Sequence, residues 1–231
     1  MRTLGIFAKQ PVPGRVKTRL AADWGNDRAA ELYECFVRDL LEKFAAIGDR
    51  RVIGFAPSTE EAQQWFDAVS KESAASGGGW SHWPQPESDL GGRIAAFFEA
   101  WTDSPEHRTI LIGSDSPSLP VDYLDQAWQL LEENDCVIGP ATDGGYYLIG
   151  FQGAVPNFNT AFCGIDWSTA GVFSQTVRQL KQHNVSLGLL PPWYDVDSAE
   201  AVVALTGHLA ALEHSGNTCS LPATQRFLKC E

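Results

Sequence analysis

The alternation of short apolar runs with amphipathic helical patterns is the feature that most constrains the fold of this chain. Apolar runs of strand length occur at residues 3–8, 51–56, 80–83, 109–113, 136–139, 146–151 and 185–190. Helical periodicity separates most of them, over residues 27–44, 59–70, 90–101, 121–133, 169–181 and 199–212. Strands that alternate with helices favour a mostly parallel sheet covered on both faces. The pattern therefore predicts an α/β fold, with one domain over residues 1–215 and a loosely packed tail at 216–231.

The loop after the first apolar run is unusually basic. The first 22 residues hold five basic side chains and no carboxylate, whereas the whole chain has 29 acidic and 17 basic residues and a net charge of -12. A basic loop on an acidic protein indicates one local anion site. Pro11, Pro13 and Gly14 keep this loop out of helix and allow a ligand to approach the backbone. A strand, a glycine-containing basic loop and a helix form a phosphate cradle, although a solvated charged turn explains the same spacing.

Composition and motifs exclude several other classes of protein. Residues 14–18 do not fit a Walker loop, and no G-x-G-x-x-G follows the first apolar run. The acidic balance argues against general binding to nucleic acid or to an anionic membrane. No apolar run approaches the roughly 20 residues of a membrane span, and no signal-peptide pattern is visible, so we expect a cytoplasmic protein. The five cysteines are scattered and odd in number, which favours reduced thiols. The sequence does not indicate an oligomeric state.

Two further loops place carboxylates at the ends of apolar runs. Asp115 follows the run 109–113, where a carboxylate is costly unless a cation pairs with it. Magnesium commonly takes one or two protein carboxylates and completes its shell with phosphates and water, so Asp115 suits a metal–phosphate site that faces the basic loop. Asp195 and Asp197 are spaced so that an extended chain points both the same way. Capping of the next turn or helix is the alternative role for Asp115 and for Asp197.

Two weaker patterns complete the candidate site. The segment Asp143-Gly144-Gly145-Tyr146 predicts a substrate pocket in which glycines admit the ligand and Asp143 accepts its hydroxyl groups. A plain Asp-Gly hairpin turn explains the same residues. Residues 85–93 offer amide and backbone groups to the edge of a base, although Ser88 or Asp89 would also cap a helix there.

Four segments, taken in order, carry a resemblance to a known family. They are AKQPVPGRVKTRL at 8–20, GSDSP at 113–117, GPATDGGYYLIG at 139–150 and DVDS at 195–198. Together they resemble bacterial proteins described as glycosyltransferases with a nucleotide-diphospho-sugar transferase fold (domain of unknown function 2064). The chain is also similar to 2-phospholactate guanylyltransferases and, more distantly, to molybdenum cofactor guanylyltransferases. The resemblance covers roughly residues 2–205.

The resemblance implies a glycosyltransferase A-type, Rossmann-like three-layer fold that binds a nucleotide with Mg²⁺ or Mn²⁺. It implies metal ligands at Asp115 and Asp197 and a phosphate-binding role for Lys17 and its loop. The nucleotide-binding residues implied in this way are Ala8, Lys9, Gly14, Arg15, Lys17, Thr18, Arg19 and Ser114, with Gln85, Asp89, Leu90 and Gly91 near the base. The chain departs from sugar-nucleotide pyrophosphorylases in having Gln10 and two prolines in the loop. It also has serines on both sides of Asp115 in place of a D-x-D.

Three functional hypotheses follow. The first is a magnesium-dependent nucleotidyltransferase that joins a nucleoside triphosphate to a small phosphorylated or hydroxylated acceptor, with Lys17 and Asp115 as its catalytic residues. The second is a glycosyltransferase that uses a nucleotide-sugar donor. The third is a nucleotide-binding protein without catalytic activity.

Overall fold

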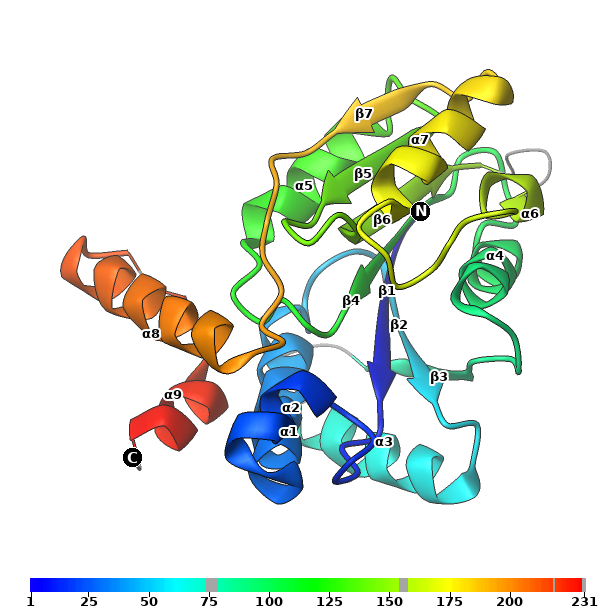
Figure 1. Cartoon of the computed structure of the whole chain (residues 1–231). Helices are drawn as coiled ribbons and strands as arrows, with labels where there is room; N and C mark the ends of the chain where they lie inside the picture. Colours follow the sequence, from blue (N-terminus) through cyan, green and yellow to red (C-terminus); the bar gives the residue numbers. More distant parts are fainter. Residues whose placement is uncertain (74–78, 154–157, 218, 230–231) are drawn as a thin grey trace.

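The computed structural model describes residues 1–73, 79–153, 158–217 and 219–229 (Figure 1). Within these ranges, seven strands form one sheet in the order β3-β2-β1-β4-β6-β5-β7. The strands are β1 (Arg2–Lys9), β2 (Arg50–Ala56), β3 (Ser81–Pro84), β4 (Arg108–Gly113), β5 (Cys136–Pro140), β6 (Tyr146–Gln152) and β7 (Leu187–Leu189). Neighbouring strands are parallel except where β6 pairs with β4 and β5. The predicted mostly parallel sheet is confirmed.

Helices cover both faces of the sheet (Figure 1). They are α1 (Thr18–Trp24), α2 (Asn26–Lys43), α3 (Glu60–Ser73), α4 (Leu90–Trp101), α5 (Val121–Leu130), α6 (Phe158–Ala161), α7 (Val172–Gln182), α8 (Ala199–His214) and α9 (Pro222–Lys229). The longer predicted elements are present with bounds that differ by a few residues. Helices α1, α6 and α9 were not predicted, because each is short and has too few apolar residues to show a helical period.

The alternation of side chains along β1 divides the core between the two faces of the sheet. Ile6 belongs to the core that α2, α3 and α5 cover, whereas Phe7 packs against the core that α4 and α7 cover. Helix α4 packs closely on β1. The ring of Phe97 lies so near Gly5 that a Cβ at this position would come 2.2 Å from it. This close packing holds the first turn of α4 beside the carboxyl ends of β1 and β4.

The segment after residue 215 corrects one expectation. The loosely packed tail predicted there is wrong for residues 222–229, which form α9 and pack on α2. The buried carboxylate of Asp39, on α2, accepts hydrogen bonds from the backbone N–H groups of Ala223 and Thr224, both at 2.9 Å. These bonds satisfy two of the N–H groups that α9 leaves unpaired at its start, where Pro222 has no N–H to satisfy. The domain boundary at residue 215 stays a prediction.

Parts of the sequence interpretation lie outside the described residues. Residues 218, 230 and 231 of the predicted tail are among them, and so is Cys230. The described cysteines, Cys35, Cys136, Cys163 and Cys219, form no disulfide. Across the described ranges, none of the helices has both the length and the apolar character needed to cross a membrane.

Candidate functional site

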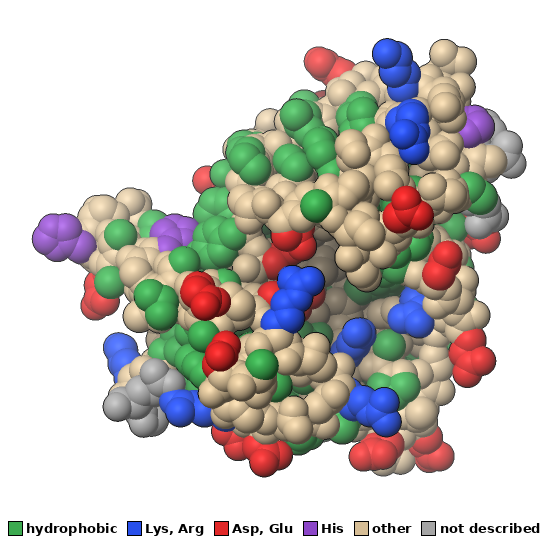
Figure 2. Space-filling model, viewed as in Figure 1, with side chains coloured by type: hydrophobic (Ala, Val, Ile, Leu, Met, Phe, Trp, Pro, Cys, Tyr) green, Lys and Arg blue, Asp and Glu red, His purple; other side chains and the backbone are tan. Residues whose placement is uncertain are grey.

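A cavity of about 620 Å³ opens at the carboxyl ends of β1 and β4. Figure 2 shows the hollow, with acidic and basic side chains along its rim. This edge is where open α/β sheets bind their ligands. The cavity brings together many of the predicted site residues, namely Ala8, Lys9, Arg15, Lys17, Thr18, Arg19, Gln85, Leu90, Ser114, Asp115, Tyr146 and Asp197.

Lys17 is the centre of the charged part of the cavity. Its Nζ donates a short hydrogen bond to Oδ1 of Asp115 and a second, of 2.7 Å, to Oδ1 of Asp197. The Lys17 side chain is 2% exposed, whereas those of Asp115 and Asp197 are 47% and 40% exposed. Burial lowers the pKa of Lys17, but the two carboxylates outweigh burial and hold the pKa above its ordinary value. The ammonium is therefore a fixed positive charge at the floor of the site.

The backbone and two aromatic rings hold this ammonium in place. Lys17 is the residue before α1 and has a left-handed conformation with a φ of 46°, which is uncommon for any residue other than glycine. Its carbonyl oxygen accepts the N–H of Ala21 at 2.8 Å, which begins the helix. Its Nζ lies 5.5 Å from the ring centroids of both Tyr33 and Phe36. Strained backbone at such a position is typical of functional sites.

Tyr33 is a site residue that the sequence analysis missed. Its hydroxyl accepts the backbone N–H of Lys9 at 3.0 Å and shares a 2.7 Å hydrogen bond with Oγ of Ser114. Burial, followed by the charge of Asp115, raises the pKa of Tyr33 to about 12. The residue thus joins the basic loop to the loop after β4. Tyr33 lies on the apolar face of α2, where helical periodicity indicates a core residue, and no sequence signal marks its hydroxyl.

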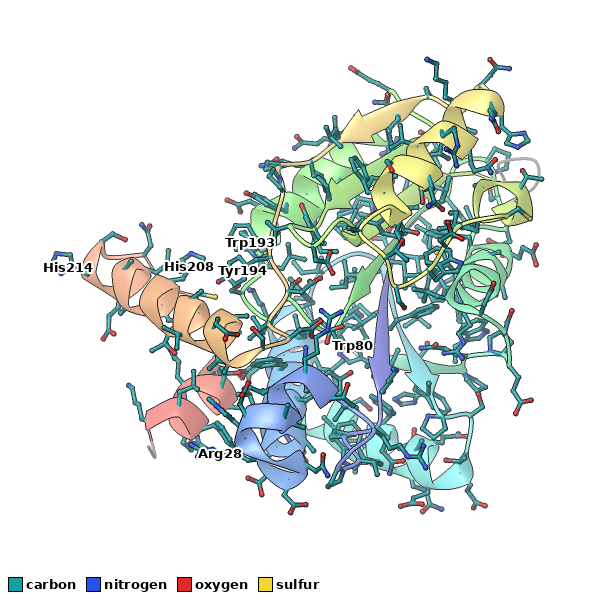
Figure 3. The ribbon with its side chains drawn as sticks, in the orientation of Figure 1. Arg28, Trp80, Trp193, Tyr194, His208 and His214 are labelled. Atoms are coloured by element: carbon teal, nitrogen blue, oxygen red, sulfur yellow. The ribbon has the colours of Figure 1, made fainter. Side chains whose placement is uncertain are left out.

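The acidic loops of residues 114–118 and 193–198 are also bound to each other. The N–H of Val196 donates to the carbonyl oxygen of Asp115 at 2.8 Å. Oγ of Ser118 donates to the Tyr194 hydroxyl at 3.0 Å, and this hydroxyl shares a 2.7 Å hydrogen bond with Nδ1 of His208. Figure 3 shows Trp193 and Tyr194 on the connection from β7 to α8, with His208 beside them. These bonds hold the segment that carries Asp197 against the segment that carries Asp115.

Asp195 belongs to the same acidic cluster but does not line the cavity. Its carboxylate accepts a hydrogen bond from Oγ of Ser116, whereas Asp197 bonds to Lys17. Burial raises the pKa of Asp195 to about 6, with further increases from Asp115, Asp143 and Asp197 and a decrease from the Ser116 bond. Asp195 and Asp197 therefore have different partners.

The raised pKa of Asp195 predicts a change of stability with pH. Between about pH 4 and pH 6 the folded state binds the Asp195 proton and the unfolded state does not, so the free energy of unfolding falls as pH rises through this window. We expect Asp195→Asn to be more stable than the wild type by about 1–3 kcal/mol at pH 8 and equally stable at pH 4. Urea unfolding of both proteins across this range measures the difference. A difference that does not change with pH would contradict the prediction.

Some predicted nucleotide-binding residues have structural roles outside the cavity lining. Oδ1 of Asp89 accepts the N–H of Gly92 at 2.8 Å, so Asp89 caps α4. Gly91 packs against Trp167, whose ring would lie 2.8 Å from a Cβ at that position. Gly14 has a φ of 75° and allows the basic loop to turn. Gln85 does line the cavity, but its amide nitrogen donates to the carbonyl oxygen of Gly54 at 2.7 Å.

The predicted substrate-binding segment also lies partly outside the cavity lining. Tyr146 lines the cavity, whereas Asp143, Gly144 and Gly145 form the turn between β5 and β6. Oδ1 of Asp143 accepts the N–H of Gly145 at 2.9 Å, and Gly144 has a φ of 95°. These are features of the plain turn that was the alternative for this segment. A substrate role for Asp143, Gly144 and Gly145 stays a prediction.

The cavity also has lining residues that the sequence analysis did not select. Arg93, on α4, is one of them, and its Nε donates to the carbonyl oxygen of Ser88 at 2.8 Å. Gly113 ends β4, and a Cβ built there would meet no heavy atom within 4 Å. Apolar residues of this kind in the lining include Phe7, Ile94, Leu111 and Ile149. The cavity therefore combines a charged end with an apolar wall.

The charged end fits a divalent cation that takes only two ligands from the protein. Asp115 and Asp197 each use one oxygen to bind Lys17, and their second oxygens have no hydrogen-bond partner in the described part of the chain. Among the described residues, no group of three or more His, Cys, Asp or Glu side chains is placed to hold a metal ion. Two carboxylates, with phosphates and water as the other ligands, form the kind of site that magnesium uses.

Comparisons with known proteins agree with this fold. A sequence model of the family described as "Uncharacterized protein conserved in bacteria (DUF2064)" matches residues 43–169, a span that contains Asp115 but neither Lys17 nor Asp197. The crystal structure of a "putative nucleotide-diphospho-sugar transferase" from Desulfovibrio desulfuricans G20 is 34% identical in sequence. It superposes with a TM-score of 0.80 over 97% of this chain and 94% of that chain.

Two more distant proteins extend the comparison. A 3-phospho-D-glycerate guanylyltransferase from Phenylobacterium zucineum (strain HLK1) is 28% identical over 144 residues, which are 61% of this chain and 62% of that protein. This chain thus matches less than two thirds of the length of that relative. The inositol-1-phosphate CTP transferase from T. maritima is 12% identical, with a TM-score of 0.53 over 95% of this chain and 98% of that chain, and shares the fold alone. The chain has the nucleotide-diphospho-sugar transferase fold.

Proposed function

The chain belongs to the DUF2064 family of bacterial proteins, and from its cavity we propose that it is a nucleotidyltransferase. It would join a nucleoside triphosphate to a small phosphorylated or hydroxylated acceptor. The observation that carries this proposal is the convergence of Lys17, Asp115 and Asp197 beside a basic loop at one end of a cavity. Phosphoryl transfer is catalysed mainly by positioning and by charge stabilisation, and this end of the cavity supplies both signs of charge.

The basic residues of the loop have separable roles in this proposal. Arg15 and Arg19 are exposed, line the cavity and have no ion-pair partner among the described residues, so their charges are available to phosphates. Lys17 is buried and would stabilise negative charge from the floor of the site. When the acceptor oxygen bonds to the α-phosphorus and the α–β phosphate bond breaks, these cations would neutralise the charge on the departing pyrophosphate.

A divalent cation, Mg²⁺ or Mn²⁺, is part of the proposal. Asp115 and Asp197 would hold it, and when bound it would supply positive charge to the nucleotide phosphates. Ser114 lies next to Asp115 and is fixed by the Tyr33 hydroxyl, so its role would be to position the loop. Arg93, which lines the cavity, would meet an anionic group of the acceptor.

The relatives support two transferase reactions. A guanylyltransferase that acts on 3-phospho-D-glycerate supports nucleotidyl transfer to a phosphorylated acid. The Desulfovibrio desulfuricans structure, named for nucleotide-diphospho-sugar transfer, favours the second candidate, a glycosyltransferase with a nucleotide-sugar donor. Both reactions would place the phosphates of a nucleotide beside the same carboxylates.

A ligand screen separates these candidates. We expect nucleoside triphosphates to raise the melting temperature in the presence of Mg²⁺ and to release pyrophosphate when a phosphorylated acid is added. Consumption of a nucleotide sugar would instead support the glycosyltransferase. Binding without turnover of either donor across a panel of acceptors would support a nucleotide-binding protein without catalytic activity. A protein that no nucleotide stabilises would contradict the proposal.

The two exposed arginines provide a more specific test. We expect the double change Arg15→Ala and Arg19→Ala to weaken binding of a triphosphate about tenfold, or about 1.4 kcal/mol, and to leave binding of the nucleoside unchanged. The reason is that their proposed partners are phosphates. Calorimetric titration of both ligands measures the two affinities. Arg178→Ala, an exposed arginine on α7 outside the cavity lining, is the matched control. Equal losses for nucleoside and triphosphate would mean that the loop binds no phosphate.

A further inference from the structure

Lys17 already provides a positive charge to the two carboxylates that the proposed function assigns to a metal ion. Its Nζ bonds to Oδ1 of Asp115 and, at 2.7 Å, to Oδ1 of Asp197. The Lys17 side chain is almost completely buried, whereas both carboxylates are about half exposed. The ammonium therefore lies on the protein side of the carboxylates, and a divalent cation would have to approach them from the cavity side.

The ammonium is not free to withdraw from this position. The left-handed backbone of Lys17 and its helix-starting bond to Ala21 fix where the side chain begins. The rings of Tyr33 and Phe36 lie 5.5 Å from Nζ and favour a cation there. Removal of the ammonium from both carboxylates would leave a buried cation without its anionic partners, which is costly. The ammonium is thus a permanent part of the site.

The charges of this cluster disfavour a divalent cation that arrives alone. Two carboxylates and one ammonium have a net charge of only -1, and the ammonium repels a second cation on the same carboxylates. The described part of the chain also offers no third acidic, histidine or cysteine ligand beside the two carboxylates. Phosphate groups would change both conditions, because they add negative charge and oxygen ligands.

We propose that Lys17 is a built-in counter-ion that prevents Asp115 and Asp197 from binding a free divalent cation. The cation then enters the site only together with the phosphates of a nucleotide. This inference rests on the proposed function, because it takes the nucleotide to be the source of those phosphates. The competing arrangement is a cation that binds the outer carboxylate oxygens without regard to Lys17, and in that case the charge of Lys17 would not affect metal affinity.

The test measures Mn²⁺ binding without nucleotide, by the loss of the free Mn²⁺ signal in electron paramagnetic resonance. We expect the wild type to bind Mn²⁺ weakly and Lys17→Met to bind it at least tenfold more tightly. The methionine removes the charge and keeps much of the length of the side chain. Lys9→Met is the matched control, because Lys9 is exposed at the end of β1, lines the cavity and bonds to neither carboxylate through its side chain. The control should keep the wild-type affinity.

Further variants locate the gained affinity on the molecule. Adding Asp197→Asn to Lys17→Met should abolish the gain, which places the new site at the two carboxylates. If Lys17→Met does not fold, Lys17→Gln keeps a hydrogen-bond donor without the charge and should also gain affinity. An equal gain in Lys9→Met would show a general charge effect and overturn the inference. Equal Mn²⁺ affinity in the wild type and in Lys17→Met would overturn it as well.

The outcome also separates this inference from the proposed function. If the wild type binds triphosphate with Mn²⁺ but Lys17→Met gains no affinity for Mn²⁺ alone, only the counter-ion role is contradicted. A wild type that binds no nucleotide with Mn²⁺ present contradicts the proposed function, whatever Lys17→Met does with the ion.

Discussion

Replacement of Asp115 by asparagine should lower the magnesium-dependent affinity for a nucleoside triphosphate at least a hundredfold. The amide has nearly the same shape as the carboxylate and removes only its charge, which the proposal assigns to the cation. The change also removes one of the two anionic partners of the buried Lys17 ammonium. We therefore expect the free energy of unfolding to fall by about 1–3 kcal/mol. Calorimetric titration with and without Mg²⁺, and urea unfolding, measure the two effects.

The control for this experiment is Asp125→Asn. Asp125 is exposed on α5 and does not line the cavity, so its change should affect neither nucleotide affinity nor stability by a measurable amount. If Asp115→Asn binds the triphosphate with an unchanged dependence on Mg²⁺, Asp115 is not a metal ligand. Its bond to Lys17 would then be purely structural.

Gly113→Leu should block the cavity without disturbing the fold. A Cβ at Gly113 meets no heavy atom within 4 Å, and Gly113 is not among the glycines with a positive φ, so the backbone accepts a side chain there. The added side chain would extend into the space that the ligand occupies. We expect nucleotide affinity to fall at least tenfold, while the melting temperature changes by no more than about 2 °C.

Gly207→Leu is the control for the glycine substitution. Gly207 lies on α8, outside the cavity lining, and a Cβ there also meets nothing within 4 Å. Its replacement should leave nucleotide binding unchanged. Normal binding by Gly113→Leu would show that the nucleotide lies elsewhere, and a large loss of stability would show that the space around Gly113 is not open.

The sequence predicts the sheet and the meeting of the charged loops for one physical reason. Parallel strands bring their carboxyl ends to one edge, so loops that follow different strands become neighbours whatever their separation in the chain. The loops that carry Lys17 and Asp115 were expected to meet for this reason, whereas Asp197 was added to the site by the family resemblance. The structure places all three residues in the same cavity. Their direct contact was not predictable, because it depends on the left-handed backbone of Lys17 and on the packing of Tyr33 and Phe36.

The roles of short polar side chains are harder to predict from the sequence, because contacts with the nearby backbone compete with contacts to a ligand. Asp89 and Asp143 each bond to a backbone N–H two or three residues away, one as a helix cap and one in a turn. A ligand contact and a local backbone contact need the same residue types beside glycine, so the sequence pattern does not distinguish them. The capping role of Asp39 could not be predicted for a different reason, because the backbone N–H groups that it binds in α9 lie 184 and 185 residues away in the sequence.

The separation of Lys17 from its partners also affects how the protein is made. Asp115 lies 98 residues and Asp197 lies 180 residues after Lys17 in the chain. A ribosome that adds about 5–20 residues per second therefore takes roughly 10–40 s to deliver the second partner after the lysine. During that interval β1 and α2 can already have emerged, while the ammonium that they bury still lacks Asp197. The charged centre of the site is thus completed only after Asp197 has been added, when the strands of the described sheet have already been synthesised.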